Sequence, residues 1–324
     1  MNSAFRTGTA FEWASRLGHH SHMVERAAYE LVRVRDGAFS IRSVAYGETM
    51  HPGLGPVAEA RALYVEQLRL VEHLLGHKGE FVIWDIGLGA AANILTVLSA
   101  LQSLDLALRV ISFDQTLDPL RFAFQHQAAL GYFAGYQHAI ERLLEAHGTE
   151  FECGRASVNW QVQVTDFPTL LERADADRLV KPHLVLFDPW SPAKNPAMWT
   201  ARLFGRLHHL LDAVRPCVLP TYSRSTLLRV TLLMSGFWVG TGRAAGRKEE
   251  TTLAANRPEW IERPLDGRWL ERAGRSSSAE PLWEPIYRRA PLSNHSRHQL
   301  RQHPQFQRAA PPEPSEVRLR GSTL

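Results

Sequence analysis

The chain contains very little cysteine, no long apolar run and no sign of a leader peptide. Only Cys153 and Cys217 occur among its 324 residues, which excludes a disulfide framework and a multi-cysteine metal site. The first twenty residues include three charged side chains and no apolar core of a signal peptide, and no window approaches the roughly 18 apolar residues of a membrane helix. We therefore expect a cytoplasmic protein with no membrane contact.

Net charge is also nearly absent from most of the chain. The formal charge is +4, but the segment 288–324 alone carries seven arginines and two glutamates, so the rest sums to −1. Nucleic-acid binding by that larger part must therefore depend on a local patch. One candidate is 222–248, which has five basic residues and no acid: Arg224, Arg229, Arg243, Arg247 and Lys248. Phosphate contacts and an ordinary solvated charged face are both compatible with it.

Short apolar runs alternate with longer helical stretches between about residues 81 and 256. This alternation is typical of an open α/β fold in which helices wrap a parallel sheet. The last two runs, FWVGTGR and ETTLAA, are separated by a glycine-containing loop, which predicts an antiparallel hairpin at one edge of the sheet. The expected strands are 81–86, 109–114, 158–164, 183–188, 216–223, 237–243 and 250–255, and the clearest helices are 118–146 and 196–213.

Three parts are expected along the chain. Residues 1–75 form an N-terminal extension with a lid or substrate segment that turns helical from Val57, because no glycine or proline interrupts 57–75. Residues 76–287 form the main α/β domain. Residues 288–324 are rich in proline, glutamine, serine and arginine and poor in large aliphatic residues, so we expect a disordered basic tail. That tail is either a solvated extension or an arm that adds affinity for RNA.

The most informative stretch is VIWDIGLGAAAN (82–93). An apolar strand ends in Asp85, and Gly87 and Gly89 follow where the strand turns into a helix. Glycine suits this position because a Cβ would block the approach of a ligand to the backbone. A P-loop is excluded, since no Lys-Ser/Thr pair follows the glycines. A tight strand-to-helix turn without a ligand is the structural alternative.

Two cofactors use a loop of this kind. Gly87, Gly89 and Ala92 satisfy the dinucleotide fingerprint, and Asp114 follows 22 residues later at a second strand end, where it could bind ribose hydroxyls. Asp85, however, would bring negative charge near a pyrophosphate. S-adenosylmethionine has no phosphate and carries a cationic sulfonium and an ammonium group. The acid therefore favours S-adenosylmethionine, while a nicotinamide oxidoreductase remains an alternative.

Further carboxylates follow the later predicted strands. Asp166 could accept a hydrogen bond from an adenine amino group while Phe167 covers the ring, although a surface aspartate beside a core phenylalanine is equally common. Asp188 begins a loop with three prolines at the carboxyl edge of the sheet, where α/β proteins bind ligands. A carboxylate there could orient an amine nucleophile and Trp190 could stack on a base. A rigid structural turn capped by Asp188 is the alternative.

Histidines 19, 20 and 22, and the pair His208 and His209, form two sequence clusters. Neither has cysteine or carboxylates at ligand spacing, and adjacent residues of a helix do not face one site, so we expect no metal.

With these residues identified, the chain resembles the class I S-adenosylmethionine-dependent methyltransferases. More narrowly, it is similar to the methyltransferase half of the bifunctional tRNA 5-methylaminomethyl-2-thiouridine biosynthesis proteins and to stand-alone relatives. The resemblance extends over about 46–256, and the loop DPWSPAKNPAMW is its most specific part. The supporting segments are WDIGLGAAAN (84–93), AEARALYVE (58–66), TYSRS (221–225) and GFWVGTGRAAGRKEE (236–250).

The resemblance implies a Rossmann-like fold with helices on both faces of the sheet and methyl transfer from S-adenosylmethionine to the aminomethyl nitrogen of a modified wobble uridine in tRNA. It implies no metal, no FAD and no flavin oxidoreductase half. It assigns the catalytic role to Asp188. The cofactor-binding residues would be Asp85, Gly87, Gly89, Asn93, Asp114, Asp166 and Phe167, and the substrate-binding residues would be Glu59, Arg61, Trp190, Lys194 and Arg224.

Three other functions remain open on the sequence. A nicotinamide oxidoreductase would bind NAD(H) at the glycine loop. An RNA-binding protein on a degenerate methyltransferase fold would bind tRNA without transferring a methyl group. A methyltransferase acting on a small amine or on a protein would keep the chemistry and change only the acceptor.

Overall fold

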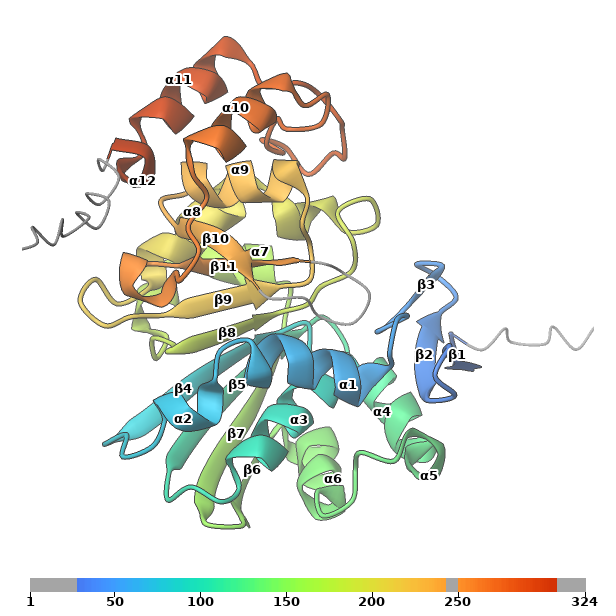
Figure 1. Ribbon diagram of the computed structural model, residues 1–324. Coiled ribbons are helices and arrows are strands. Elements are labelled where there is room, and N and C mark those ends of the chain that lie inside the picture. Colours follow the sequence, from blue (N-terminus) through green and yellow to red (C-terminus); the bar gives the residue numbers. More distant parts are fainter. Residues whose placement is uncertain (1–27, 243–249, 308–324) are drawn as a thin grey trace, which may run out of the picture.

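The computed structural model describes residues 28–242 and 250–307. Its centre is an eight-stranded sheet with the order β10-β11-β9-β8-β4-β5-β7-β6 (Figure 1). The pairs from β9 through β8, β4 and β5 to β7 are parallel, and the pairs at both edges are antiparallel. The strands are β4 Glu80–Ile86, β5 Ala107–Asp114, β6 Gly148–Cys153, β7 Ala156–Val164, β8 Leu184–Phe187, β9 Val218–Thr221, β10 Trp238–Gly242 and β11 Thr251–Ala255.

Every strand expected from the apolar runs is present, and the hairpin β10–β11 lies at one edge as predicted. The edge strand β6 was missed, because its sequence GTEFEC alternates with charged residues and directly follows a helix. The helix expected over 118–146 is three helices: His126 leaves the helical conformation after the first, and Gly131 and Gly135 adopt positive φ angles between the second and the third. These are α4 Asp118–Gln125, α5 Gln127–Leu130 and α6 Gln137–Ala146. The helix expected over 196–213 is the 3-10 turn η3 Pro196–Trp199 followed by α8 Ala201–Leu210.

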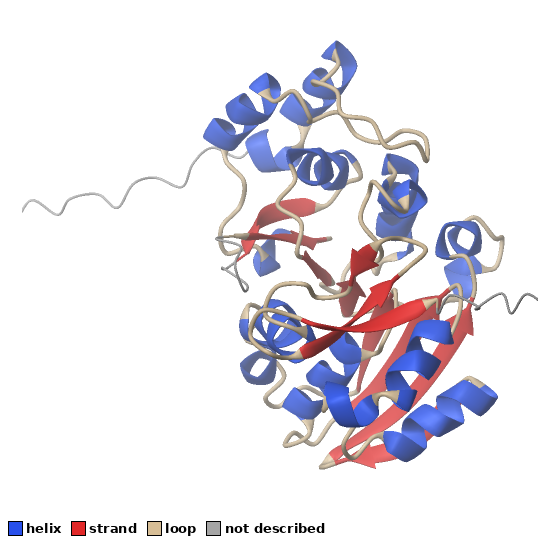
Figure 2. Cartoon of the chain, turned by 90° about the vertical axis from the view of Figure 1, so that its right-hand side faces the viewer, coloured by secondary structure: helices blue, strands red, loops and turns tan. Residues whose placement is uncertain are grey.

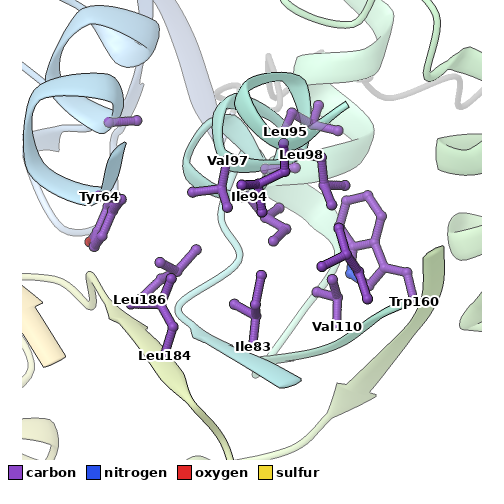
Figure 3. Close-up of a cluster of buried hydrophobic side chains, with 14 of the residues drawn as sticks. Tyr64, Ile83, Ile94, Leu95, Val97, Leu98, Val110, Trp160, Leu184 and Leu186 are labelled. Atoms are coloured by element: carbon purple, nitrogen blue, oxygen red, sulfur yellow. The ribbon is translucent and has the colours of Figure 1, made fainter. Parts of the chain in front are cut away.

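Helices cover both faces of the sheet, as Figure 2 shows from the side. Neighbouring residues of β4 face opposite ways, so that Ile83 belongs to one buried cluster and Trp84 to the other. On the first face, α3 Ala92–Leu101 packs Ile94 and Leu98 over the sheet (Figure 3). The second face is covered by α7 Phe167–Leu171, α8, α9 Thr226–Met234, α10 Gly267–Arg275 and α11 Asn294–Gln302.

The N-terminal segment forms its own small antiparallel sheet, which lies beside the main one (Figure 1). Its strands are β1 Tyr29–Arg33, β2 Phe39–Ser43 and β3 Glu48–Thr49. The sequence analysis did not predict these strands. The helix expected from Val57 is interrupted, because Arg69 adopts a left-handed conformation. It consists of α1 Pro56–Ala60, the π-helical turn η1 Arg61–Glu66 and α2 Leu70–His73.

The C-terminal prediction of disorder from residue 288 is wrong for 288–307. This part folds into α11 and α12 Pro304–Gln307, with Leu292 and Leu300 buried against the second cluster. The Gln305 side chain bonds to the backbone of edge strand β10, where it accepts from Val239 N and donates to Val239 O, both at 2.8 Å. A few well-placed contacts thus order a segment whose average composition predicts disorder. Residues 308–324 lie outside the described residues.

The remaining elements are the short 3-10 turns η2 Ala176–Arg178 and η4 Pro258–Trp260. Among the helices of 28–242 and 250–307, none has the length and apolar character that crossing a membrane requires. Strand β4 lies between β5 and β8 at the centre of the sheet. The chain continues from β4 to β5 and β7 on one side, and later to β8 and β9 on the other side. In open α/β sheets the crevice at such a switch point, beside the carboxyl ends of the strands, is where ligands bind.

Candidate active site

A cavity of about 700 Å³ opens at this switch point, a volume usual for small-molecule sites. It lies beside the carboxyl ends of β4, β5, β8 and β9, and the loop after β3 covers it from the other side. We call the contributions of 86–93, 113–119 and 188–199 the sheet wall, and the contribution of 46–59 the N-terminal wall. Among the residues predicted as functional, those that line the cavity are Glu59, Gly87, Gly89, Asn93, Asp114, Phe167, Asp188, Trp190 and Arg224.

The glycine loop of the sheet wall depends on the absence of side chains. Gly87 has a φ of 88°, and a Cβ on it would lie 2.9 Å from the carbonyl oxygen of Asp188. Only glycine therefore allows the loop after β4 to pack on the loop after β8. Ala91, the N-cap of α3, has a φ of 61°, which is strained for a residue with a Cβ. Backbone strain at this turn makes the loop a candidate for function.

Asp114 closes the same loop from the end of β5. Its Oδ2 accepts a hydrogen bond from Gly89 N at 2.9 Å, and its Oδ1 accepts one from Gln115 N at 2.8 Å. Burial raises the pKa of the Asp114 carboxyl above its usual value, although backbone N–H donors, with Gly89 the strongest, lower it in part. The glycine loop and Asp114, which the sequence predicts to bind one cofactor together, are therefore in direct contact.

Two side chains from separate elements, Asn93 and His51, meet on the carboxylate of Asp188. Asn93 Nδ2 donates to Asp188 Oδ2 at 2.9 Å, and His51 Nε2 lies 3.3 Å from the same oxygen. His51 Nε2 also lies 3.0 Å from Asn93 Oδ1. Asp188 follows β8, Asn93 is in the first turn of α3, and His51 belongs to the N-terminal wall. This cluster joins the two walls of the cavity.

His51 was missed by the sequence analysis. The available signal was a histidine in a glycine- and proline-rich stretch shortly before Glu59, but nothing in the sequence shows that it meets Asp188. Burial of the imidazole opposes its protonation, but the hydrogen bond and the negative charge of Asp188 outweigh burial and raise the pKa of His51 above its usual value. A histidine with a perturbed pKa beside a carboxylate in a cavity is a candidate functional group.

Glu59 organises the N-terminal wall. Its buried carboxylate accepts hydrogen bonds from the backbone N–H groups of Gly53 at 2.7 Å and Leu54 at 2.9 Å. These bonds fasten the loop that carries His51 to helix α1. Arg61 was predicted to act with Glu59, but it is exposed and does not line the cavity. A shift of two positions on a helix points the two side chains in different directions.

An aromatic pair stands at the cavity between the two walls. Trp190 stacks on Tyr46 with ring centroids 4.8 Å apart and an interplanar angle of 21°. Close by, the carboxylate of Glu48 accepts hydrogen bonds from Ser191 N at 3.1 Å and from the Ser191 hydroxyl. The small N-terminal sheet is thus attached directly to the proline-stiffened loop of the sheet wall.

The sequence matches known proteins along most of its length. The model of a family described as S-adenosyl-L-methionine-dependent methyltransferase matches residues 132–257. The MnmC proteins, named tRNA 5-methylaminomethyl-2-thiouridine biosynthesis bifunctional protein, are 30% identical over 72% of this chain in Aeromonas hydrophila and 27% identical over 69% in Methylibium petroleiphilum. The matched regions cover 36% and 34% of those relatives, so the chain spans about a third of their length.

The crystal structure of MNMC2 from Aquifex aeolicus has the same fold. It aligns with a TM-score of 0.62 and 23% identity over 86% of this chain and 85% of that one. The protein is an S-adenosylmethionine-dependent methyltransferase. The predicted Rossmann-like fold, with helices on both faces of the sheet, is confirmed.

In this methyltransferase, two of the predicted cofactor-binding carboxylates have other roles. Asp85 is 1% exposed and lies beneath the loop, where its Oδ2 accepts a hydrogen bond from Ser112 Oγ at 2.8 Å. It does not line the cavity. Burial raises the pKa of Asp85 to about 7, since desolvation outweighs the hydrogen bond from Ser112. The prediction that Asp85 contacts the cofactor is therefore corrected: its side chain points to the α3 side of the sheet.

Asp166 also lies off the cavity, although Thr165 and Phe167 line it. Its Oδ2 accepts from Thr169 N at 3.1 Å, so the side chain caps helix α7, and its Oδ1 accepts from Gln115 Nε2 at 2.6 Å. Desolvation, the largest single cause, raises the pKa of Asp166, but the hydrogen bonds from Thr169 and Gln115 together outweigh it. The pKa of Asp166 therefore lies below its usual value. The predicted contact with an adenine amino group is thus replaced by helix capping.

The predicted basic patch over 222–248 is only partly exposed. Arg224 is exposed at the cavity, but Arg229 is 3% exposed and donates hydrogen bonds to Thr252 Oγ1, Glu250 Oε1 and Thr251 O. Arg229 therefore holds the strand β11 in place and is not available to phosphate. Lys194 is exposed and does not line the cavity. Arg243, Arg247 and Lys248 lie outside the described residues.

The two histidine clusters give no metal site in the described part of the chain, where no three metal-ligating side chains gather. His208 is packed against Phe237, with ring centroids 4.9 Å apart. His19, His20 and His22 precede the described residues.

Proposed function

We propose that this methyltransferase modifies the aminomethyl group of a wobble uridine in tRNA, converting 5-aminomethyl-2-thiouridine to 5-methylaminomethyl-2-thiouridine. The observation that carries the proposal is the carboxylate of Asp188, held by Asn93 and His51 at a cavity that also presents Trp190. The names of the relatives support the choice of acceptor. Because tRNA is modified in the cytoplasm, the proposal also assigns the protein to that compartment.

The sheet wall fits the methyl donor. Gly87 and Gly89 leave the backbone open to a ligand, Asp114 can accept hydrogen bonds from ribose hydroxyls, and buried Phe167 can cover an adenine ring. When bound, S-adenosylmethionine supplies a methyl group on a cationic sulfonium. The carboxylates of Asp114 and Asp188 give this end of the cavity a negative field that suits a cation.

Asp188 acts on the acceptor in this proposal. Its carboxylate accepts an N–H of the acceptor amine and directs the nitrogen lone pair toward the methyl carbon, which is catalysis by orientation. Trp190, stacked on Tyr46, offers an aromatic face to a base, and Arg224 offers a cation to a phosphate. Residues 46–59, with Glu59 as their anchor, cover the acceptor as the substrate segment.

The decisive experiment is incubation with methyl-labelled S-adenosylmethionine and bulk tRNA from cells that lack the terminal wobble methylation. Digestion to nucleosides should then yield labelled 5-methylaminomethyl-2-thiouridine. Label in another nucleoside would correct the acceptor, and no label in tRNA would remove the tRNA proposal.

A small amine or a protein is the second candidate acceptor. The burial of Arg229 favours it, because one of the cations expected to bind phosphate is unavailable. The two acceptors are distinguished by salt: tRNA binding through several phosphates weakens steeply as the salt concentration rises, whereas binding of a small amine does not. The nicotinamide alternative predicts that NAD(H), and not S-adenosylmethionine, raises the melting temperature.

A further inference from the structure

The position of His51 is unusual in both backbone and side chain. Its φ of 48° lies in the left-handed region, and Pro52 follows it, which further restricts its backbone. Its side chain is 8% exposed and ends on Asp188 Oδ2 and Asn93 Oδ1. Such strain in a residue with a Cβ persists only where the surroundings impose it, and here Glu59 holds the backbone of the loop two residues later.

The direction of the hydrogen bonds determines which ring nitrogen carries a proton. Asn93 donates through Nδ2 to the carboxylate of Asp188, so its Oδ1, an acceptor only, faces His51 Nε2. Nε2 must therefore bear a hydrogen, which it shares between Asn93 Oδ1 and Asp188 Oδ2. His51 consequently cannot take a proton from Asp188 at Nε2, and the second proton of the ring binds at Nδ1.

We propose that His51 is a positioning residue of the methyl transfer, which fixes the carboxylate of Asp188 together with Asn93 and sets by its own charge how strongly that carboxylate retains an ammonium group. The inference rests on the proposed function in one respect, namely that the acceptor is an amine. It adds a residue that acts through Asp188 and not on the substrate itself.

The charge of His51 matters because an ammonium group has no lone pair to attack with. An isolated carboxylate stabilises the ammonium form, whereas a carboxylate paired with imidazolium attracts it less. Protonated His51 thus favours loss of the amine proton to water. The neutral amine then forms the nitrogen–carbon bond, the sulfur–carbon bond breaks, its electron pair stays on sulfur, and the product is a methylated ammonium.

Two ionisations therefore oppose each other. A rise in pH deprotonates the amine and increases the rate, while loss of the His51 proton decreases it, so the rate should follow a bell-shaped profile. The groups around His51 are consistent with this direction. Asp188 and Glu59 both favour the imidazolium electrostatically, and Asn93 is neutral. Tyr222 and Arg224 line the same cavity, but neither contributes to the raised pKa of His51.

The first test is single-turnover kinetics against pH at saturating methyl donor. His51→Gln keeps an N–H donor and removes the titration, so we expect a roughly tenfold lower rate at neutral pH and no decline on the alkaline side. His51→Phe removes the donor as well and should lose roughly 10²-fold, with donor affinity within about twofold of wild type. His138→Phe, whose wild-type side chain is 86% exposed on α6, is the matched control and should change nothing. A wild-type profile in His51→Gln would overturn the proposal.

The second test needs no acceptor and separates this proposal from the tRNA function. Ring ¹⁵N resonances of the full chain without substrates, assigned with His51→Gln, should show His51 protonated at Nε2 and titrating above the ordinary imidazole pKa of 6.5. Asp188→Asn should lower that titration by about one unit or more. If His51 titrates at or below the ordinary imidazole pKa, or if its titration is the same in Asp188→Asn, the proposal fails. If the titration behaves as expected but tRNA takes no label, only the acceptor is wrong.

Discussion

The two walls of the cavity are built in different ways. The sheet wall is made of strand ends and a helix start, so Gly87, Asp114 and Asp188 are placed by the backbone of the fold. The N-terminal wall is held by individual side-chain bonds, chiefly those of Glu59 and Glu48. In the proposed function, donor binding would therefore depend on the whole sheet, whereas acceptor positioning would depend on a few contacts that single substitutions can remove.

The largest effect is expected at Asp188, where the walls meet. Asp188→Ala should keep binding of S-adenosylmethionine and lower the single-turnover rate by roughly 10² to 10⁴, because the amine loses its orienting acceptor. Calorimetry for the donor and rapid-quench kinetics measure the two quantities. Asp175→Ala, at a surface ion pair with Arg173, is the control and should retain the wild-type rate. An unchanged rate in Asp188→Ala would end the assignment.

Asp85, buried beneath the sheet wall, should lower the stability of the protein in a pH-dependent way. Its folded pKa of about 7 lies above that of an unfolded aspartate, so its contribution to stability is fully present below about pH 4 and is lost as the pH rises through 7. Asp85→Asn should therefore be more stable than wild type at pH 8 by up to about 4 kcal/mol, with a smaller difference at pH 4. Denaturant unfolding at the two pH values tests this. A pH-independent difference would refute the buried, protonated state.

Substitution of Gly87 tests whether the sheet wall requires a residue without a side chain at this position. Gly87→Ala places a Cβ 2.9 Å from the Asp188 carbonyl oxygen at a φ of 88°, and we expect a loss of about 1–3 kcal/mol in unfolding free energy together with weakened donor binding. Gly205→Ala is the matched control, because Gly205 lies in helix α8 with open space around its Cβ position. That change should stabilise the protein by about 0.5–1 kcal/mol.

Substitution of Glu59 tests how the N-terminal wall is held, and its expected effect on stability is the smallest of the four. Glu59→Ala leaves the N–H groups of Gly53 and Leu54 without their acceptor, at a cost of about 1–2 kcal/mol. We expect a higher KM for the acceptor and unchanged affinity for the donor. Exposed Glu66→Ala, in the same helical region, should alter neither. Equal loss of donor and acceptor binding in Glu59→Ala would mean that the walls are not independent.

The sequence predicted most of the sheet wall, because buried parallel strands are continuous apolar runs and their ligand-facing residues follow directly at the strand ends. Asp85 was wrongly placed because it lies one residue inside β4, where alternation turns its side chain away from the cavity. Asp166 was misassigned although the sequence held the signal, since an aspartate followed by a proline in the first turn is typical of a helix start.

The N-terminal wall could not be predicted, because its partners are distant in sequence and no periodicity connects them. His51 meets Asp188 across 137 positions, and Glu48 meets Ser191 across 143. Both contacts depend on how the small sheet β1–β3 docks on the large one. The folded end of the chain was missed for a related reason, since three buried residues, Leu292, Leu300 and Gln305, outweigh a composition that is otherwise polar.

The bonds of Gln305 have a consequence for the outer rim of the sheet. Its amide imitates a peptide group and occupies both hydrogen-bonding positions of Val239, so this rim of the strand offers no free backbone there to a neighbouring molecule. A chain shortened before Leu292 would leave Val239 N without its acceptor, while Val239 O would keep its hydrogen bond from Leu265 N. Such a truncated protein should self-associate by strand pairing. Helix α12, which carries Gln305, therefore protects the protein against aggregation.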